Sequence, residues 1–319
     1  MSTSSTQVSF AITLVQKYIE QKSLPNLLFY GPPGTGKTST IVACAKRMYD
    51  KSYNMMCLEL NASDQRGIDV VRELIKTFAE TQVPFGGGEV NTKLVILDEA
   101  DAMTRDAQAA LRRIMEKYSK TTRFCMICNY VSKIIPALQS RTTKFKFRQI
   151  SSNDAAGRLK QICDTEQIDV TEDAILDVVK ISDGDMRKMV NMLQSIHMSL
   201  KSRPELENLK VDRNYVFKLT GFPNPADIDR IFAILLESDD ILKSYKEIND
   251  IRKNKGISLV SLLKDLSEKL MAAKTPGNMK GNIFKRMADI EYRLSVGASE
   301  EKQLASLVGG FMEARHVVS

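Results

Sequence analysis

Residues 26–39 read NLLFYGPPGTGKTS, in which a short apolar run leads directly into a glycine-rich loop. Gly31, four further residues, and then Gly36, Lys37 and Thr38 fit the phosphate-loop pattern G-x4-G-K-[ST]. The apolar run predicts a strand, and the residues after the loop predict a helix. Glycines let backbone N–H groups turn toward phosphate oxygens, and a helix N-terminus adds partial positive charge. The alternative, a chance glycine-rich loop, leaves the strand and the helix on either side unexplained.

A second motif, LVILDEAD at residues 94–101, is an apolar run that ends in acidic residues. By itself such a cluster can be a solvated loop, but beside a phosphate loop it predicts the rest of a nucleotide site. Asp98 is expected to hold Mg²⁺, directly or through water, and Glu99 to orient and activate an attacking water. Lys37 would contact the β- and γ-phosphates of ATP, and Thr38 would offer its hydroxyl to the magnesium. The expected nucleotide-binding residues are Gly31, Pro32, Pro33, Gly34, Thr35, Gly36, Lys37, Thr38 and Ser39.

The first 150 residues alternate short apolar runs with helical patterns. Strands are expected at 26–30, 55–60, 94–98, 123–129 and 144–147, with helices following the phosphate loop and at 67–80 and 104–118. This order predicts an α/β domain with a parallel five-stranded sheet, covered by helices on both faces, whose ligands lie beyond the carboxyl ends of the strands.

Two cysteines, Cys125 and Cys128, form a C-x-x-C pattern within the apolar run at 123–129. Side chains three positions apart on a strand face opposite sides, so the two thiols should diverge. No second pair of cysteines or histidines is spaced to complete a zinc site. A buried strand is therefore predicted here. The odd total of five cysteines argues against a disulfide framework.

From about Ser151 the sequence predicts only helices, including 154–165, 172–181 and 186–200. A turn-rich GFPNP at 221–225 marks a boundary, and the helical pattern after it is interrupted at 255–256 and 275–278. The predicted plan has three domains: an α/β domain over 1–150, a small helical domain over 151–221 and a second helical domain over 222–319.

The composition of the 319 residues is that of a globular protein, with 43% hydrophobic and 27% charged residues. A net charge of +7 mildly favours an acidic partner such as nucleic acid. No apolar run approaches the ~20 residues that span a bilayer, so no membrane association is expected. The N-terminus, MSTSSTQVSF, lacks the pattern of a secretory signal, so an intracellular protein is expected.

GPPGTGKTST together with LDEAD is similar to the AAA+ ATPases. LELNASDQRGID (58–69), AQAALRRIMEKY (107–118) and ICNYVSKIIPALQSRTTKFKF (127–147) narrow the resemblance to the small subunits of the clamp loader replication factor C. The resemblance implies an AAA+ ATPase domain, a helical lid and an all-α collar. It also implies a nuclear complex with four other subunits that uses ATP and Mg²⁺ to open the sliding clamp, PCNA, and load it at primer–template DNA.

The resemblance assigns roles to three further residues. Asn129 matches the sensor-1 position, where a polar side chain contacts the γ-phosphate or the attacking water, although it could simply start a turn. Arg187, in GDMRK (184–188), matches sensor 2 of the lid, although it could be a solvated helix residue. Arg141 matches the arginine finger, which acts in trans on the ATP of a neighbouring subunit. The family usually has cysteine where this chain has Thr142.

Contacts with DNA and the clamp are also implied by the resemblance. The candidates for DNA phosphates are Arg66, Arg72, Lys76, Arg112 and Arg113, and surface salt bridges are the alternative for each. Gln65 departs from the acidic residue usual in the family. Residues 78–93 correspond to a region that faces the clamp, where Phe78, Val83 and Phe85 would supply apolar contacts unless they pack internally.

The start of the chain departs from the family, whose members begin with a further stretch that resembles Trp-Val-Glu-Lys-Tyr-Arg-Pro and helps to form the adenine pocket. Phosphate binding is still expected, because Lys37 and Thr38 are present. One alternative is a scaffold subunit that hydrolyses no ATP but supplies Arg141 in trans. A second alternative is a hexameric helicase or protein-remodelling ATPase, which the collar-like C-terminus and Ser140-Arg141 disfavour.

Overall fold

The computed structural model describes residues 24–63, 68–81, 92–202 and 210–316. They form two compact units. The first unit contains the described residues up to Glu166 together with Ser182–Gln194, and the second contains Gln167–Ile181 and the residues from Ser195 onward. None of the helices in the described ranges combines the length and the apolar character needed to cross a membrane.

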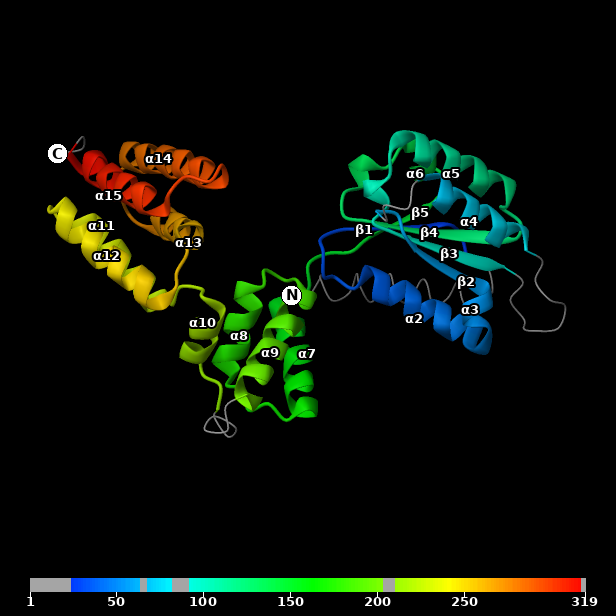
Figure 1. Ribbon diagram of the computed structural model, residues 1–319, viewed down its shortest axis with the longest axis horizontal. Coiled ribbons are helices and arrows are strands. Elements are labelled where there is room, and N and C mark those ends of the chain that lie inside the picture. The colour runs from blue at the N-terminus through cyan, green and yellow to red at the C-terminus, as the bar shows by residue number, and fades with distance from the viewer. Residues whose placement is uncertain (1–23, 64–67, 82–91, 203–209, 317–319) are drawn as a thin grey trace. The chain divides into compact units, whose positions relative to one another are not determined.

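A parallel five-stranded sheet lies at the centre of the first unit (Figure 1). Its strands are β1 (Leu27–Tyr30), β2 (Cys57–Asn61), β3 (Lys93–Asp98), β4 (Thr122–Cys128) and β5 (Thr143–Lys146). The order across the sheet is β2-β3-β4-β1-β5, and every neighbouring pair is parallel. The predicted parallel five-stranded sheet is therefore confirmed.

The second strand begins later than the sequence predicts. Residues Tyr53–Met56 form a short helix, α3, so β2 begins at Cys57 and not at Met55. A short apolar run does not distinguish a strand from one buried helical turn, and Met56 is buried in the helical conformation.

Helices cover both faces of the sheet, as predicted (Figure 1). Helix α2 (Lys37–Tyr49) packs on one face, where Leu27 and Phe29 of β1 meet Ile41. The opposite face carries α4 (Ile68–Glu80), α5 (Arg105–Lys117) and α6 (Pro136–Gln139). There Leu28 of β1 shares a core with Leu111 of α5. Because successive strand residues point to opposite faces, one short strand contributes to both cores. The remaining elements of this unit are η1 (Asp50–Ser52), η2 (Ala100–Ala102), η3 (Val131–Lys133) and α7 (Ser152–Glu166).

The two cysteines of the C-x-x-C pattern lie on opposite faces of β4. Cys125 belongs to the core beneath α2, and Cys128 belongs to the core beneath α5. Both thiols are free, as are the other three. Burial raises the pKa of Cys128 to about 12, which keeps its thiol protonated at neutral pH. The predicted buried strand with diverging thiols is confirmed.

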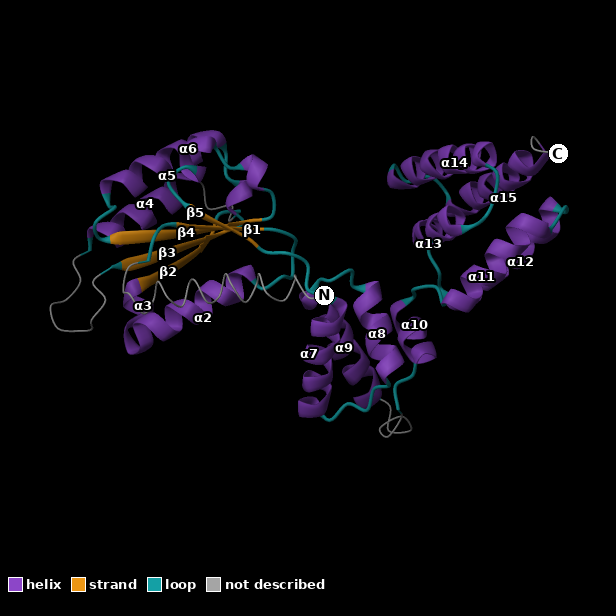
Figure 2. Cartoon of the chain, turned by 180° about the vertical axis from the view of Figure 1, so that it is seen from behind, coloured by secondary structure: helices purple, strands orange, loops and turns teal. Residues whose placement is uncertain are grey.

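The second unit is helical in the part that the structure describes (Figure 2). Helix α9 (Met186–Lys201) begins in the first unit and ends in this one. The other helices are α8 (Glu172–Ile181), α10 (Arg213–Thr220), α11 (Pro225–Glu237), α12 (Ile241–Lys255), α13 (Leu259–Ala272), α14 (Gly277–Ser295) and α15 (Glu300–His316).

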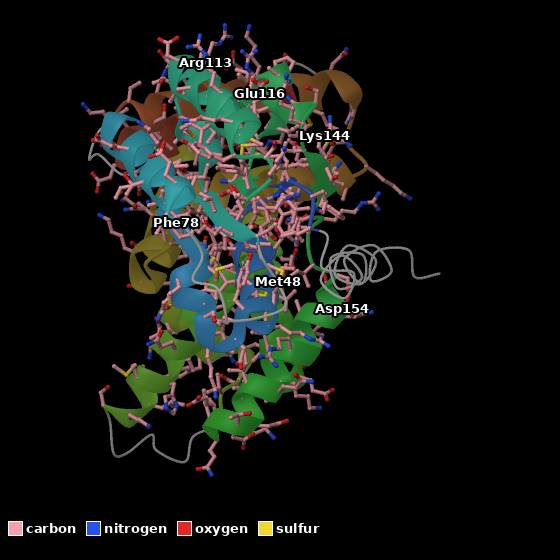
Figure 3. All side chains as sticks on the ribbon, turned by 90° about the vertical axis from the view of Figure 1, so that its right-hand side faces the viewer. Met48, Phe78, Arg113, Glu116, Lys144 and Asp154 are labelled. Atoms are coloured by element: carbon pink, nitrogen blue, oxygen red, sulfur yellow. The ribbon has the colours of Figure 1, made fainter. Side chains whose placement is uncertain are left out.

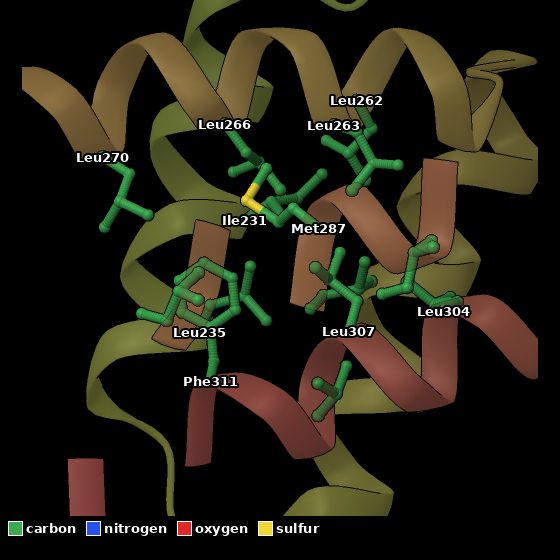
Figure 4. Packing of buried hydrophobic residues seen from close by; sticks show 14 of the residues in the cluster. Ile231, Leu235, Leu262, Leu263, Leu266, Leu270, Met287, Leu304, Leu307 and Phe311 are labelled. Atoms are coloured by element: carbon green, nitrogen blue, oxygen red, sulfur yellow. The ribbon is translucent and has the colours of Figure 1, made fainter. Parts of the chain in front are cut away.

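Helices α11 to α15 enclose one apolar core (Figure 4). Leu262 and Leu266 of α13 meet Ile231 of α11 and Leu307 and Phe311 of α15 there. Burial of such side chains contributes about 1.5–3 kcal/mol each, so these helices hold together chiefly through this core.

The predicted interruptions of the helical pattern are found where glycine and proline stand. Gly221 and Gly256 end α10 and α12 in the left-handed conformation, with φ of 69° and 66°. Glycine has no Cβ and adopts this conformation at little cost, which is why it is common directly after the last residue of a helix. The break at 275–278 falls where α14 begins, at Gly277 after Pro276.

Candidate nucleotide-binding site

The phosphate loop connects β1 to α2 at the carboxyl edge of the sheet, as predicted. Gly31 has a φ of 144°, and a Cβ there would lie 2.0 Å from the carbonyl oxygen of Phe147. Gly36 precedes α2 with a φ of 86° and has open space around it. Gly31 is thus required both by its close approach to Phe147, just after β5, and by its positive φ, whereas Gly36 is required by its backbone conformation alone.

The loop is also tied to the start of helix α9. The backbone N–H of Met186 donates to the carbonyl oxygen of Gly34 at 3.2 Å. A Cβ on Gly34 would lie 1.8 Å from a carboxylate oxygen of Asp185, so the two segments touch. Asp185 in turn accepts the N–H groups of Arg187 and Lys188, at 2.9 and 3.3 Å. This cap fixes the position of Arg187 at the first turn of the helix.

Lys37 points back into the loop. Its Nζ donates to the carbonyl oxygens of Gly31 and Pro32, at 2.8 and 2.7 Å, and to Oδ1 of Asn129 at 3.1 Å. Only 7% of the residue is exposed. Desolvation by this burial lowers the pKa of Lys37, and the neighbouring Asp98 carboxylate partly offsets the effect. The ammonium is therefore held between the loop and Asn129, where a phosphate can replace the two carbonyls as its partner.

Oxygen atoms of Thr38 and Asp98 meet beside this lysine. The Thr38 hydroxyl donates to Oδ2 of Asp98 at 2.7 Å, and Oδ1 of the same carboxylate accepts the N–H of Glu99 at 2.8 Å. A hydroxyl and a carboxylate facing a shared cavity are the hard oxygen ligands that Mg²⁺ prefers. These two residues therefore fit the predicted magnesium site.

Glu99 adopts an uncommon backbone conformation. Its φ and ψ are 54° and 36°, in the left-handed region that residues with a Cβ rarely occupy. Such strain is concentrated at functional sites in proteins. The residue follows the buried strand β3 and lines the same cavity as Lys37 and Thr38.

Asp101 is a functional candidate that sequence reasoning did not single out. Its Oδ2 accepts the backbone N–H groups of Asn129 and Tyr130, at 3.3 and 3.2 Å. These bonds hold the segment that follows β4, and with it the Asn129 side chain, against the strand end that carries Asp98. The last residue of the acidic motif was the signal available in the sequence.

A cavity of about 460 Å³ joins these residues. Its size is in the range of small-molecule and cofactor sites. It is lined by the predicted residues Pro33, Gly34, Thr35, Gly36, Lys37, Thr38, Ser39, Asp98, Glu99, Asn129 and Arg187, and by Ile150, Met186, Val190 and Asn191, which were not predicted. Arg187 is far from the phosphate loop in the sequence. It lines the same cavity because the neighbouring Met186 contacts Gly34 of the loop.

Arg141 lies at the other edge of the sheet. Its carbonyl oxygen accepts from Asn26 Nδ2 at 3.5 Å, and Asn26 immediately precedes β1. The residue itself comes two positions before β5 begins. Strands β1 and β5 are parallel, and Arg141 lies at their amino ends. The nucleotide site lies at their carboxyl ends, so the length of a strand, about 13 Å, separates Arg141 from it.

The remaining candidates are distributed over the first unit. Lys76 and Arg113 are exposed, and Arg112 lies 3.8 Å from Glu116. Phe78 packs partly buried against the core of α5, and the Lys93 ammonium lies over its ring at 5.0 Å. Arg66, Val83 and Phe85 lie outside the described residues, and so does the side chain of Arg72.

Comparison with known families agrees with this geometry. Residues 27–151 match the model of the ATPase family associated with various cellular activities (AAA). Residues 157–198 match an RCF1/5-like AAA+ ATPase lid domain, and residues 223–310 match the replication factor C C-terminal domain. The fold and the site are those of an AAA+ ATPase.

Several curated proteins are similar over almost the whole chain. Replication factor C subunit 5 of Homo sapiens is 46% identical over 308 residues, which are 96% of this chain and 87% of that protein. Subunit 5 of Arabidopsis thaliana is 45% identical, with 96% and 83% covered. Subunit 3 of Saccharomyces cerevisiae is 41% identical, with 93% and 86% covered. The chain belongs to the replication factor C subunits. These names agree with the resemblance of KMVNMLQS (188–195) and MADIEYRLSVG (287–297) to animal subunit 5 and yeast subunit 3.

Solved structures support the fold alone. The Thermotoga maritima RuvB Holliday junction branch migration motor aligns with a TM-score of 0.53 at 14% identity, covering 84% of this chain and 89% of its own. The Aeropyrum pernix Orc1 protein in complex with DNA aligns with a TM-score of 0.51 at 16% identity, covering 99% and 84%.

Proposed function

We propose that this chain is an ATP-binding and ATP-hydrolysing subunit of a five-subunit nuclear clamp loader, which opens the sliding clamp PCNA and loads it at primer–template junctions in DNA replication and repair. The observation that supports this most strongly is the convergence of Lys37, Thr38, Asp98, Glu99 and Asn129 on one cavity. The names of the relatives supply the link to replication. Residues 1–150 would form the ATPase domain, 151–221 the lid and 222–319 the collar.

The residues of the site have distinct roles in hydrolysis. Lys37 leaves its loop carbonyls for the β- and γ-phosphates, and backbone N–H groups of Gly34 to Thr38 surround the same oxygens. Thr38 and Asp98 would hold Mg²⁺, which supplies charge neutralisation at the phosphates. Glu99 orients the attacking water and accepts its proton, while Asn129 contacts the γ-phosphate or that water.

Two arginines complete the proposal. Arg187 lines the cavity from the start of α9 and would contact the γ-phosphate as sensor 2. Arg141 lies at the far edge of the sheet from its own phosphate loop, which supports action in trans on the ATP of a neighbouring subunit. There its charge would stabilise the phosphoryl group in the transition state.

A binding experiment tests the proposed site. The chain would be assembled with its four partner subunits, whose own phosphate loops are inactivated, and titrated with a fluorescent ATP analogue. We expect Lys37→Ala to abolish binding, because the cationic partner of the phosphates is lost. Lys46→Ala, an exposed lysine of the same helix, is the matched control and should bind as the unmodified chain does.

The outcome separates two functions. Binding that only Lys37→Ala removes supports the ATPase. Negligible binding by all three complexes contradicts a working site and leaves the scaffold role, in which this chain contributes Arg141 and hydrolyses nothing.

A further inference from the structure

Arg141 is held by an ion pair within its own chain. Its Nη2 lies 2.7 Å from Oε1 of Glu116 on helix α5. Its Nη1 donates to the carbonyl oxygen of Ala137 at 2.9 Å and to the Ser140 hydroxyl at 3.4 Å. The guanidinium therefore has partners on both α5 and the α6 segment, which fix its direction.

Both side chains of this pair face solvent. The Arg141 and Glu116 side chains are 40% and 44% exposed. Figure 3 shows Glu116, with Arg113, at the outer surface of the helical layer. A neighbouring subunit can thus reach the guanidinium while the pair remains intact, since Arg has five N–H donors and the contacts above use three of them.

The strength of the pair decides what it can do. Exposed ion pairs are weak because water and salt screen them. Such a pair is too weak to withhold a guanidinium from the several negative charges of a bound nucleotide. It is strong enough to select among the many rotamers of an arginine side chain, which otherwise lose considerable entropy when they are fixed.

A second arginine approaches the same oxygen. Arg112, one helical turn before Glu116, has its Nε 3.8 Å from Oε1. That Nε is buried and makes no hydrogen bond within the described residues. One negative charge on Glu116 therefore lies near two guanidinium groups, and its removal leaves both of them without this counter-charge.

We propose that Glu116 is a positioning residue for Arg141, which it holds ready at the surface for the ATP of the neighbouring subunit. This inference rests on the proposed function, in which Arg141 acts in trans. Because the guanidinium is ordered before the reaction, less conformational entropy is lost on reaching the transition state. Loss of Glu116 should accordingly slow turnover at the neighbouring site without changing the binding of ATP there.

The test uses the five-subunit complex in which only the subunit that receives Arg141 keeps an active phosphate loop, and this chain carries Lys37→Ala so that its own site is silent. In this background Glu116→Ala should lower kcat for ATP about three- to tenfold and leave KM unchanged. Glu116→Gln, which keeps an acceptor oxygen, should retain part of the rate. The matched control is Asp169→Ala, since the Asp169 side chain is 68% exposed and pairs with Lys210 at 3.8 Å; it should change neither constant.

A double substitution identifies the route of the effect. With Arg141→Ala already present, Glu116→Ala should cause no further loss, because a positioning residue has nothing left to position. An equal loss in both backgrounds, a rise in kcat or an unchanged kcat would overturn the inference. An unchanged rate with Arg141→Ala alone would instead overturn the proposed action of Arg141 in trans. Co-purification of all five subunits shows that each variant folds.

Discussion

Gln108 should be a decisive residue for the segment that connects Asn129 to Arg141. Its side chain is 1% exposed. Its Nε2 donates to the carbonyl oxygens of Met103 and Lys133, at 3.1 and 3.0 Å, and its Oε1 accepts the N–H of Ile135 at 2.8 Å. One amide thus satisfies three backbone groups from two separate loops.

Replacement of Gln108 by methionine isolates these hydrogen bonds, because methionine has nearly the same volume and leaves no large cavity. The part-buried N–H of Ile135 and two carbonyl oxygens then lose their Gln108 partner. At roughly 1 kcal/mol for each group, the substitution should cost about 3 kcal/mol of local stability. Exposed Gln161, whose side-chain oxygen accepts from Arg158 of its own helix, supplies the control Gln161→Met, for which less than about 0.5 kcal/mol is expected.

Native-state hydrogen exchange of the full chain measures the effect at the affected amide. The N–H of Ile135 should exchange on the order of a hundredfold faster in the Gln108→Met protein, since each 1.4 kcal/mol is a factor of ten. Unchanged protection of Ile135 would refute the argument that Gln108 holds this segment. Loss of protection throughout the sheet would show instead that the substitution acts on the whole unit.

Two further predictions concern the phosphate loop. Gly31→Ala should abolish ATP-analogue binding and lower the melting temperature, because its Cβ would overlap the Phe147 carbonyl oxygen. Gly36 has open space around it, so Gly36→Ala should cost only about 1 kcal/mol of backbone strain. Equal effects of the two substitutions would contradict this reasoning. Desolvation lowers the pKa of Lys37 below 10.5, so the folded protein releases this proton at a lower pH than the unfolded chain does. Between the folded-state and unfolded-state pKa values, the free-energy cost of burying the charge therefore diminishes as pH rises. Nucleotide affinity should fall over the same interval as the ammonium is lost, which titrations between neutral pH and pH 10 will detect; a decline identical in Lys37→Ala protein would assign it to another group.

Local patterns accounted for much of this fold. The phosphate loop and the LDEAD motif each lie within a few residues of sequence, and both fold where the pattern predicts. The parallel sheet followed from the alternation of strands and helices. Helix α3 was missed because Met55 and Met56 continue the apolar run of β2, and hydrophobicity alone does not specify the backbone conformation.

Contacts between segments that are distant in the sequence were harder to predict from the sequence. That Asp101 binds the N–H groups after β4, or that Met186 reaches Gly34, depends on how strands and helices meet in space. The pairing of Glu116 with Arg141 is of the same kind, since charged residues on exposed helix faces have many possible partners. Motifs thus indicated which residues take part, and only the packed structure shows which residues hold them in place.

The order of strands in the sheet has a consequence for synthesis of the chain. Strand β1 is the first strand of the described chain, yet both of its neighbours, β4 and β5, come much later in the sequence. At the usual speed of translation, a nascent β1 waits on the order of ten seconds for Thr143–Lys146 to leave the ribosome. Until β4 (Thr122–Cys128) has emerged as well, its apolar side chains have no neighbouring strand to pair with. The nucleotide loop that follows β1 therefore becomes ordered only after most of the first unit has been synthesised.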